Sequence, residues 1–125
     1  AADHLLKTVA ADLYVFDFHA EATSEKKAMG YHLDGRAAVC FGTHTHVQTS
    51  DARILPCGTG YLTDLGMTGA QESVIGVKWQ QSLAFFRGGP APRFENSSEQ
   101  CHLQGALFTL GSDGRCQHVQ LIDET

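Results

Sequence analysis

The chain has 125 residues, of which 42% are hydrophobic, and a formal net charge of −5 with its histidines neutral. This length allows one core, so we expect residues 1–125 to form a single domain or part of one. Scattered basic residues exclude the positive surface of a protein that binds a nucleic-acid groove. No apolar run reaches the ~20 residues that span a bilayer. The cysteines have no zinc-finger spacing, and we expect free thiols in a reducing cytoplasm.

The first part of the chain alternates between helical and β patterns. Apolar residues at helical spacing predict helices, and runs of aromatic and β-branched residues predict strands, the first of them buried. The second helix has Thr23 or Ser24 as its candidate N-cap and Gly35 just after its end. In chain order we expect a helix over 3–11, a strand over 13–18, a helix over 23–33, strands over 37–41, 53–56 and 58–64, and a helix over 77–87.

The last part of the chain is typical of β structure. Residues 103–110 and 116–122 are two β runs, and residues 111–114 (GSDG) between them are a hairpin signal. We therefore predict a layered α/β fold that ends in an antiparallel β hairpin. In the preceding helix, Trp79, Leu83 and Phe86 share one face and are expected to pack on the core.

Residues 42–46 (GTHTH) are the densest group of potential metal ligands. Residues two apart in an extended strand point to the same side, about 6–7 Å apart. Imidazole suits zinc, iron, copper and nickel, and two rings can share one ion or serve two ions about 3.5–4 Å apart. A bare pair of this kind is more often two surface histidines, but other polar residues also follow predicted strands. They are His19 and Glu21 after the first strand and Thr63 and Asp64 after a later one.

Because ligands bind at the carboxyl ends of strands in open α/β sheets, these positions favour a metal site. For several side chains, both a role in the metal site and a purely structural role remain open. Glu21 is a ligand partner or, as we favour, a helix-start carboxylate, and Asp64 either orients a ligand histidine or caps the next turn. Asp17, if buried, needs a partner such as a histidine N–H. Asp51 and Arg53 are expected to form a solvated ion pair.

No other nucleophile stands out. The chain has no Gly-x-Ser-x-Gly motif and no glycine-rich phosphate loop with its lysine. A metal-activated water is therefore the best candidate. The remaining histidines lack ligand-like neighbours and are expected on the surface or half-buried; they are His4, His32, His102 and His118.

Three ordered segments resemble one known family. They are residues 17–26 (DFHAEATSEK), 42–49 (GTHTHVQT) and 63–69 (TDLGMTG), together with the shorter stretches 54–56 and 58–59. They are similar to the bacterial YmdB-type branch of the calcineurin-like metallophosphoesterases. The resemblance runs nearly from end to end and is densest over residues 14–76.

The resemblance implies a fold, a cofactor and an activity. The fold would be a four-layer α/β/β/α sandwich with two divalent or trivalent metal ions, iron or manganese. His19 and His44 would bind the second ion and His46 the first, while Asp17, Glu21, Thr45 and Asp64 are candidates for holding these ligands in place. The substrates would be small phosphodiesters such as 2′,3′-cyclic nucleotides, attacked in line by a hydroxide that bridges the ions.

The family's first-half motifs are not in this chain. They are an aspartate on the first strand, a Gly-Glu-Asn motif with the bridging carboxylate, and a Gly-Asn-His motif with the catalytic histidine. We therefore expect a partial domain, the C-terminal portion of the sandwich, that is inactive alone and is completed by a missing N-terminal half, with self-association into a homo-oligomer as a further expectation. Two alternatives stay open: a non-catalytic metal-binding or regulatory domain, and a cupin-type oxygenase, which would require an all-β barrel.

Overall fold

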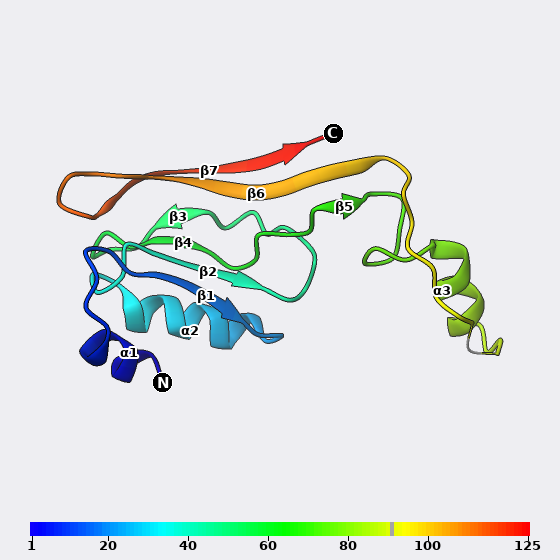
Figure 1. Cartoon of the computed structure of the whole chain (residues 1–125), viewed down its shortest axis with the longest axis horizontal. Coiled ribbons are helices and arrows are strands. Elements are labelled where there is room, and N and C mark those ends of the chain that lie inside the picture. Colours follow the sequence, from blue (N-terminus) through cyan, green and yellow to red (C-terminus); the bar gives the residue numbers. More distant parts are fainter. Residues whose placement is uncertain (91) are drawn as a thin grey trace.

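The computed structural model of the protein describes residues 1–90 and 92–125 and shows a mixed α/β fold, as predicted. Helices and strands alternate up to β2, and the chain ends in two long strands (Figure 1). The elements are α1 (Ala2–Thr8), β1 (Val15–His19), α2 (Thr23–Leu33), β2 (Val39–Thr43), β3 (Arg53–Ile54), β4 (Gly60–Leu62), β5 (Gly69–Ala70), α3 (Trp79–Phe86), β6 (Cys101–Leu110) and β7 (Cys116–Glu124).

The first sheet has the strand order β1-β2-β4-β3. Strands β1, β2 and β4 are parallel, and β3 is antiparallel to β4. The α2 segment connects β1 to its parallel neighbour β2, as a crossover must. Parallel strands with an intervening helix exclude the all-β barrel of the cupin interpretation.

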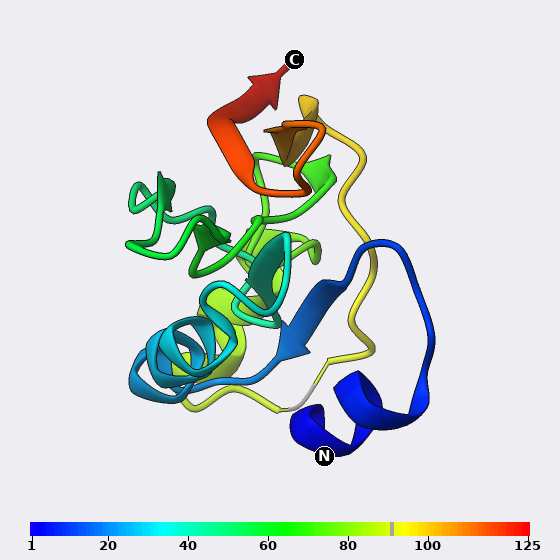
Figure 2. The ribbon, with the colours of Figure 1, turned by 90° about the vertical axis from the view of Figure 1, so that its left-hand side faces the viewer.

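The second sheet contains the predicted hairpin. Strands β6 and β7 pair antiparallel from Leu103↔Glu124 to Leu110↔Cys116, and β5 adds to the free edge of β6. The hairpin and α2 lie on opposite sides of the first sheet (Figure 1), and Figure 2 shows the same order. The rings of Phe41 and Phe108 stack between the two sheets, with their centroids 6.5 Å apart.

The core lies between α2 and the first sheet. Leu33 packs there with Cys40 and Tyr61, all almost fully buried. Burial raises the pKa of the Cys40 thiol to about 11. Gly30 allows the close approach of the helix, because a Cβ at this position would lie 2.5 Å from the Tyr61 ring. Packing against a buried aromatic ring thus holds α2 in place above the strands.

The first strand differs from its predicted burial. Alternate residues of β1 are exposed, and Val15 is 58% exposed, because β1 is an edge strand and the face opposite α2 is not covered there. The predicted cap is also wrong. Ala22 occupies the N-cap of α2, and no side chain makes a capping hydrogen bond to this helix.

Helix α3 does not pack on the core as predicted. Phe86 is 80% exposed, Trp79 and Leu83 are exposed as well, and Ser82 is the buried residue of the helix. Helical spacing predicted a continuous apolar face correctly but contains no information about what covers it. Among the described residues, no helix is long and apolar enough to cross a membrane.

Candidate functional site

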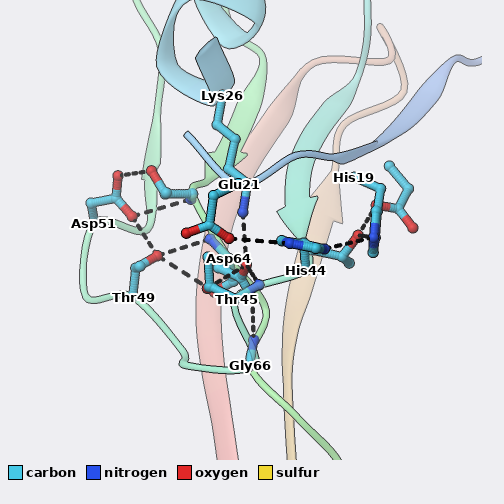
Figure 3. Close-up of polar contacts among 12 residues, drawn as sticks. His19, Glu21, Lys26, His44, Thr45, Thr49, Asp51, Asp64 and Gly66 are labelled. Carbon is cyan, nitrogen blue, oxygen red and sulfur yellow. Dashed lines mark hydrogen bonds and ion pairs between the residues drawn. The ribbon is translucent and has the colours of Figure 1, made fainter. Parts of the chain in front are cut away.

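The parallel pairing of β1 and β2 brings two of the predicted ligands together. His19 ends β1 and pairs in register with Thr43, the last residue of β2, so His44 follows beside it. His44 Nδ1 lies 2.9 Å from His19 Nε2. The two rings meet edge to face, with centroids 4.7 Å apart (Figure 3). The structure therefore gathers two imidazoles at the carboxyl ends of neighbouring strands.

A hydroxyl and a carboxylate orient the ring of His19. Thr43 Oγ1 lies 2.8 Å from Asp17 Oδ1 and 3.0 Å from His19 Nδ1. An ionised carboxylate only accepts hydrogen bonds, so the Thr43 hydroxyl donates its proton to Asp17. Its oxygen then accepts from His19 Nδ1–H, which leaves the lone pair of His19 on Nε2. Asp17 is exposed, so the burial under which we expected it to need a partner is absent, and it acts on His19 through Thr43.

Glu21 lies beside the second ring. Its Oε2 is 3.1 Å from His44 Nε2, in an exposed polar contact. We had favoured a helix-start carboxylate, but the structure shows no side-chain cap on α2 and places the carboxylate of Glu21 against His44. The series Asp17, Thr43, His19, His44 and Glu21 is thus a continuous row of polar contacts (Figure 3).

His46 has a different environment. It lines a hollow together with His102. Among the described residues, the hydrogen bond and the ring contact of this site join only His19 and His44. Among residues 1–90 and 92–125, no three His, Cys, Asp or Glu side chains come close enough to hold one metal ion. The assignment of His46 as a metal ligand therefore stays a prediction.

Asp64 anchors the loop that contains the two histidines. It is fully buried, and its Oδ2 accepts hydrogen bonds from Thr45 N (3.0 Å), Thr45 Oγ1 (2.7 Å) and Lys26 Nζ (2.8 Å). Its Oδ1 accepts from Gly66 N at 3.0 Å, which also makes Asp64 the cap of the next turn. Burial, the largest influence, would raise the pKa of Asp64, but the hydrogen bonds from Lys26, Gly66 and Thr45 together lower it.

Thr49 and Asp51 secure the far end of this loop. Asp64 N donates to Thr49 Oγ1 (3.0 Å), and Thr49 Oγ1 donates to Asp51 Oδ1 (2.8 Å). Asp51 also accepts from Thr63 N at 3.1 Å and Thr63 Oγ1 at 2.5 Å. Against the opposing effect of burial, these bonds lower the pKa of Asp51. The expected Asp51–Arg53 ion pair is wrong, because Arg53 donates to the Tyr31 hydroxyl instead.

Both loop histidines adopt strained backbone conformations. The φ angle is 107° at His44 and 63° at His46, in the region that side chains other than glycine rarely occupy. Such residues cost about 1–3 kcal/mol each and persist only where surrounding contacts hold them. Thr45, between the histidines, makes two bonds to a buried carboxylate, so Asp64 supplies this restraint.

The residues present fit a metal site in part. His19 Nε2 carries a lone pair directed at His44 Nδ1, 2.9 Å away, and imidazole nitrogen is a suitable ligand for iron or zinc. A transition metal takes four or more ligands, and the described residues bring only two imidazoles together here. The chain thus contains a partial ligand set.

A family model described as YmdB-like protein matches residues 1–122. The chain belongs to the YmdB-like family. Named relatives support this. A Bacillus subtilis (strain 168) protein named 2′,3′-cyclic-nucleotide 2′-phosphodiesterase is 45% identical over 111 residues, which are 87% of this chain and 42% of that protein. A Mycoplasma pneumoniae protein, named provisionally as a phosphatase/phosphodiesterase, is 47% identical over 100 residues, 79% of this chain and 36% of its own length.

Solved structures of similar proteins have the same fold. A crystal structure described as a novel phosphatase from Mycoplasma pneumoniae superposes with a TM-score of 0.91 at 39% identity, over 98% of this chain and 44% of that one. A hypothetical protein from Thermus thermophilus gives 0.83 at 42% identity, over 99% of this chain and 50% of its own. The YmdB-like chain thus spans about two fifths of the length of the curated relatives it matches.

Several residues that organise the YmdB-like site could not be recognised from the sequence pattern. Thr43 was not singled out, although its place two residues after Phe41 at the end of β2 puts it beside His19 in the parallel register. Lys26 was not considered, because a lysine in a predicted helix is usually solvated. Thr49 was not singled out and Asp51 was paired with Arg53, because both lie in a loop, where periodicity contains no signal about hydrogen-bond partners.

Proposed function

We propose that this chain forms part of the catalytic domain of a metal-dependent phosphoesterase that hydrolyses phosphodiesters such as 2′,3′-cyclic nucleotides. The observation that supports it most is the imidazole pair at the carboxyl ends of β1 and β2, with the His19 ring oriented by Thr43 and Asp17. The names of the relatives point to the same reaction class.

In this proposal His19 and His44 hold one ion and His46 holds the other, iron or manganese in each case. Two bound ions would neutralise phosphate charge and activate a water molecule. Thr43 keeps the proton of His19 on Nδ1, so that Nε2 stays available as a ligand. Asp64 fixes Thr45 and thereby the backbone directions of His44 and His46. Glu21 stabilises the His44 ring from the exposed side.

We further propose that residues outside these 125 complete the site and the fold. The finer expectation is a four-layer α/β/β/α sandwich in which the remaining layers supply the carboxylate ligands and the general acid. Two observations support it: the relatives are more than twice as long as the matched segment, and the described residues bring only two ligands together. If so, the 125-residue chain alone is inactive. A cytoplasmic location is a separate prediction.

A non-catalytic metal-binding or regulatory domain is the second candidate. The partial ligand set favours it, because two neutral imidazoles without a bridging carboxylate bind one ion at most, and weakly. The two functions separate on activity. A regulatory domain binds metal with no turnover, even when the rest of the sandwich is present.

A chimera tests the proposal. Residues 1–122 of this chain replace the matching segment of the Bacillus subtilis relative, and hydrolysis of 2′,3′-cyclic AMP is measured with Mn²⁺. We expect turnover, and we expect His44→Ala to lower kcat/KM by about 100-fold or more and to lower the bound metal. His118→Ala, on the exposed side of β7, is the matched control and should leave both unchanged.

The opposite result is equally informative. A chimera that folds and binds Mn²⁺ without turnover would favour the regulatory domain. Full activity and full metal content in the His44→Ala variant would remove His44 from the site.

A further inference from the structure

The side-chain amide of Gln48 joins the loop of residues 44–49, the histidine loop, to two other parts of the fold. Its Nε2 lies 3.2 Å from the carbonyl oxygen of Leu65, 2.9 Å from that of Gly105 and 3.0 Å from that of Ile122. Leu65 belongs to the turn between β4 and β5. Gly105 and Ile122 face each other across the β6–β7 pair. One side chain of the histidine loop thus bonds to this turn and to both strands of the hairpin.

These acceptors fix the orientation of the Gln48 amide. A carbonyl oxygen accepts hydrogen bonds and cannot donate them, so the amide nitrogen must face the three carbonyl groups. Its two protons serve three acceptors, and one proton is therefore shared. Gly66 in the turn makes room for this side chain, because a Cβ at Gly66 would lie 2.9 Å from Gln48 Cβ. Gln48 is therefore held both by its hydrogen bonds and by the shape of the turn.

His46 depends on contacts made by its neighbours in the chain. Its φ of 63° lies in a region that residues other than glycine seldom occupy. His46 and Val47 are both exposed, so the packing of their side chains does not hold this conformation. On the N-terminal side, Thr45 is bonded to the buried carboxylate of Asp64. On the C-terminal side, Gln48 is bonded to the turn and the hairpin, so His46 lies between two anchored residues.

We propose that Gln48 is a positioning residue for His46, and that through Gln48 the β6–β7 hairpin determines the direction of this candidate metal ligand. The inference rests on the proposed function, in which His46 holds one ion, and deepens it by naming the contact that keeps His46 in place. Strained residues at functional sites persist only where surrounding contacts hold them. Gln48 supplies such contacts on the side of His46 that Asp64 does not reach.

NMR of the unchanged 125-residue chain gives the first test, for which no variant has to fold. A positive φ brings the amide and α protons of one residue close together, so His46 should show a strong nuclear Overhauser effect (NOE) between them. The side-chain amide protons of Gln48 should exchange with solvent more slowly than those of Gln120, which is exposed on β7. A missing His46 NOE, or equal exchange at the two glutamines, would overturn the inference.

Two substitutions test the role of the Gln48 amide. Gln48→Met keeps a side chain of similar length and removes the donor. Gln48→Glu also removes the donor and, at neutral pH, places a negative charge against three carbonyl oxygens. We expect the His46 NOE to weaken in Gln48→Met and to weaken further in Gln48→Glu, because the loop is free to leave the strained conformation. A side chain that only filled space would leave the NOE of Gln48→Met unchanged.

Gln104→Met is the matched control, because Gln104 joins the same turn to the same hairpin. Its Oε1 accepts from Met67 N at 3.2 Å, and its Nε2 lies 3.2 Å from Asp123 Oδ2. Within residues 1–90 and 92–125, none of its side-chain hydrogen bonds goes to the histidine loop. Gln104→Met should therefore leave the His46 NOE unchanged. An effect as large as that of Gln48→Met would indicate general loosening of the hairpin and would overturn the specific role of Gln48.

The affinity for Mn²⁺ tests whether this positioning serves the site. In the chimera with the Bacillus subtilis relative, we expect Gln48→Met to weaken Mn²⁺ binding by about 10–100-fold, as for other residues that orient a ligand, and Gln104→Met to leave it unchanged. A weakened His46 NOE with unchanged Mn²⁺ affinity would make Gln48 a structural contact only and would overturn the inference.

The failure of this inference and the failure of the proposed function give different results. An active chimera whose Mn²⁺ affinity does not respond to Gln48→Met removes the positioning role alone. An inactive chimera in which Gln48→Met still weakens Mn²⁺ binding supports the positioning role and removes the proposed reaction. A chimera that folds and binds no Mn²⁺ would overturn both.

Discussion

Asp64 shows how one buried carboxylate can control an exposed loop. Its side-chain bonds go to the backbone and hydroxyl of Thr45, to Lys26 and to the Gly66 amide, and none goes to an imidazole ring. Breaking a buried ion pair by removing one partner costs about 3–5 kcal/mol, because the other charge is left uncompensated. The geometry of His44 and His46 therefore depends on a pair of residues that no ligand would touch.

Gly42 is the residue that makes room for this pair. A Cβ at Gly42 would lie 2.0 Å from the Thr63 carbonyl oxygen and 2.8 Å from Lys26 Cδ, and the backbone atom cannot move aside. We expect Gly42→Ala to lower the free energy of unfolding by about 1–3 kcal/mol or more, as measured by urea denaturation. Gly105→Ala is the control: a Cβ there meets nothing within 4 Å, so stability should be nearly unchanged. Equal losses in the two variants would contradict the close approach.

Acid should destabilise the protein through Asp51 and Asp64. The pKa of each lies below the ordinary value of 3.8 in the folded chain. As pH falls, these carboxylates take up protons in the unfolded chain before they do so in the folded chain. The stability that they contribute is therefore full above the unfolded pKa, declines as pH falls, and is lost below the folded pKa. We expect the free energy of unfolding to decrease as pH falls from about 5 toward 2. Asp51→Asn should make that decrease less steep. An unaltered slope would show that the Asp51 carboxyl does not contribute to the pH dependence of the free energy of unfolding.

At the scale of elements, the parallel register of β1 and β2 determines which side chains meet. The sequence pattern predicted both strands and placed polar residues at their ends, and this part of the site could be anticipated. It could not show that His19 pairs with Thr43, because register depends on contacts between distant segments. The hydrogen bond from His19 to Thr43, which fixes the tautomer of His19, is therefore visible only in the folded sheet.

Thr43→Val tests whether Thr43 fixes the tautomer of His19. Valine has nearly the same shape but no hydroxyl, so His19 Nδ1–H loses its acceptor. We expect the proton of His19 to redistribute toward Nε2, seen as a change in long-range ¹H–¹⁵N correlations of the ring. Affinity for Mn²⁺ should fall by about 10–100-fold, as for other residues that orient a ligand. Thr109→Val, on the exposed side of β6, is the control and should alter neither the His19 spectrum nor the Mn²⁺ affinity. A wild-type ring spectrum in Thr43→Val would contradict the hydrogen-bonded series from Asp17 through Thr43 to His19.

Burial was the property that the patterns predicted least well. Both β1 and α3 were recognised as elements, yet Val15 of β1 and the large apolar residues of α3 are exposed. An apolar stripe indicates that something covers it and does not identify the cover.

At the scale of the whole molecule, large apolar residues are exposed on several elements. Val15 on β1, Leu103 and Leu107 on β6, and Phe86 on α3 are each about half exposed or more. A sandwich with further layers would bury such residues. Without those layers, the chain should display hydrophobic surface to small probes.

Dye binding measures this surface. We expect the 125-residue chain to enhance the fluorescence of 1-anilinonaphthalene-8-sulfonate, and Phe86→Glu to reduce the enhancement, because Phe86 is the most exposed aromatic residue of α3. Gln80→Glu adds the same charge to the same helix without removing apolar area, so it serves as the control. Equal reductions in both variants would mean that charge alone repels the anionic dye.

The bond from Thr45 N to Asp64 has a consequence for motion. This amide lies between two exposed histidines, yet its hydrogen is held by a fully buried carboxylate. Exchange with deuterium at Thr45 should therefore require that the bond to the buried Asp64 carboxylate opens, and it should proceed almost as slowly as in the core. The loop would then be rigid before a ligand arrives, so that it would lose little conformational entropy on binding.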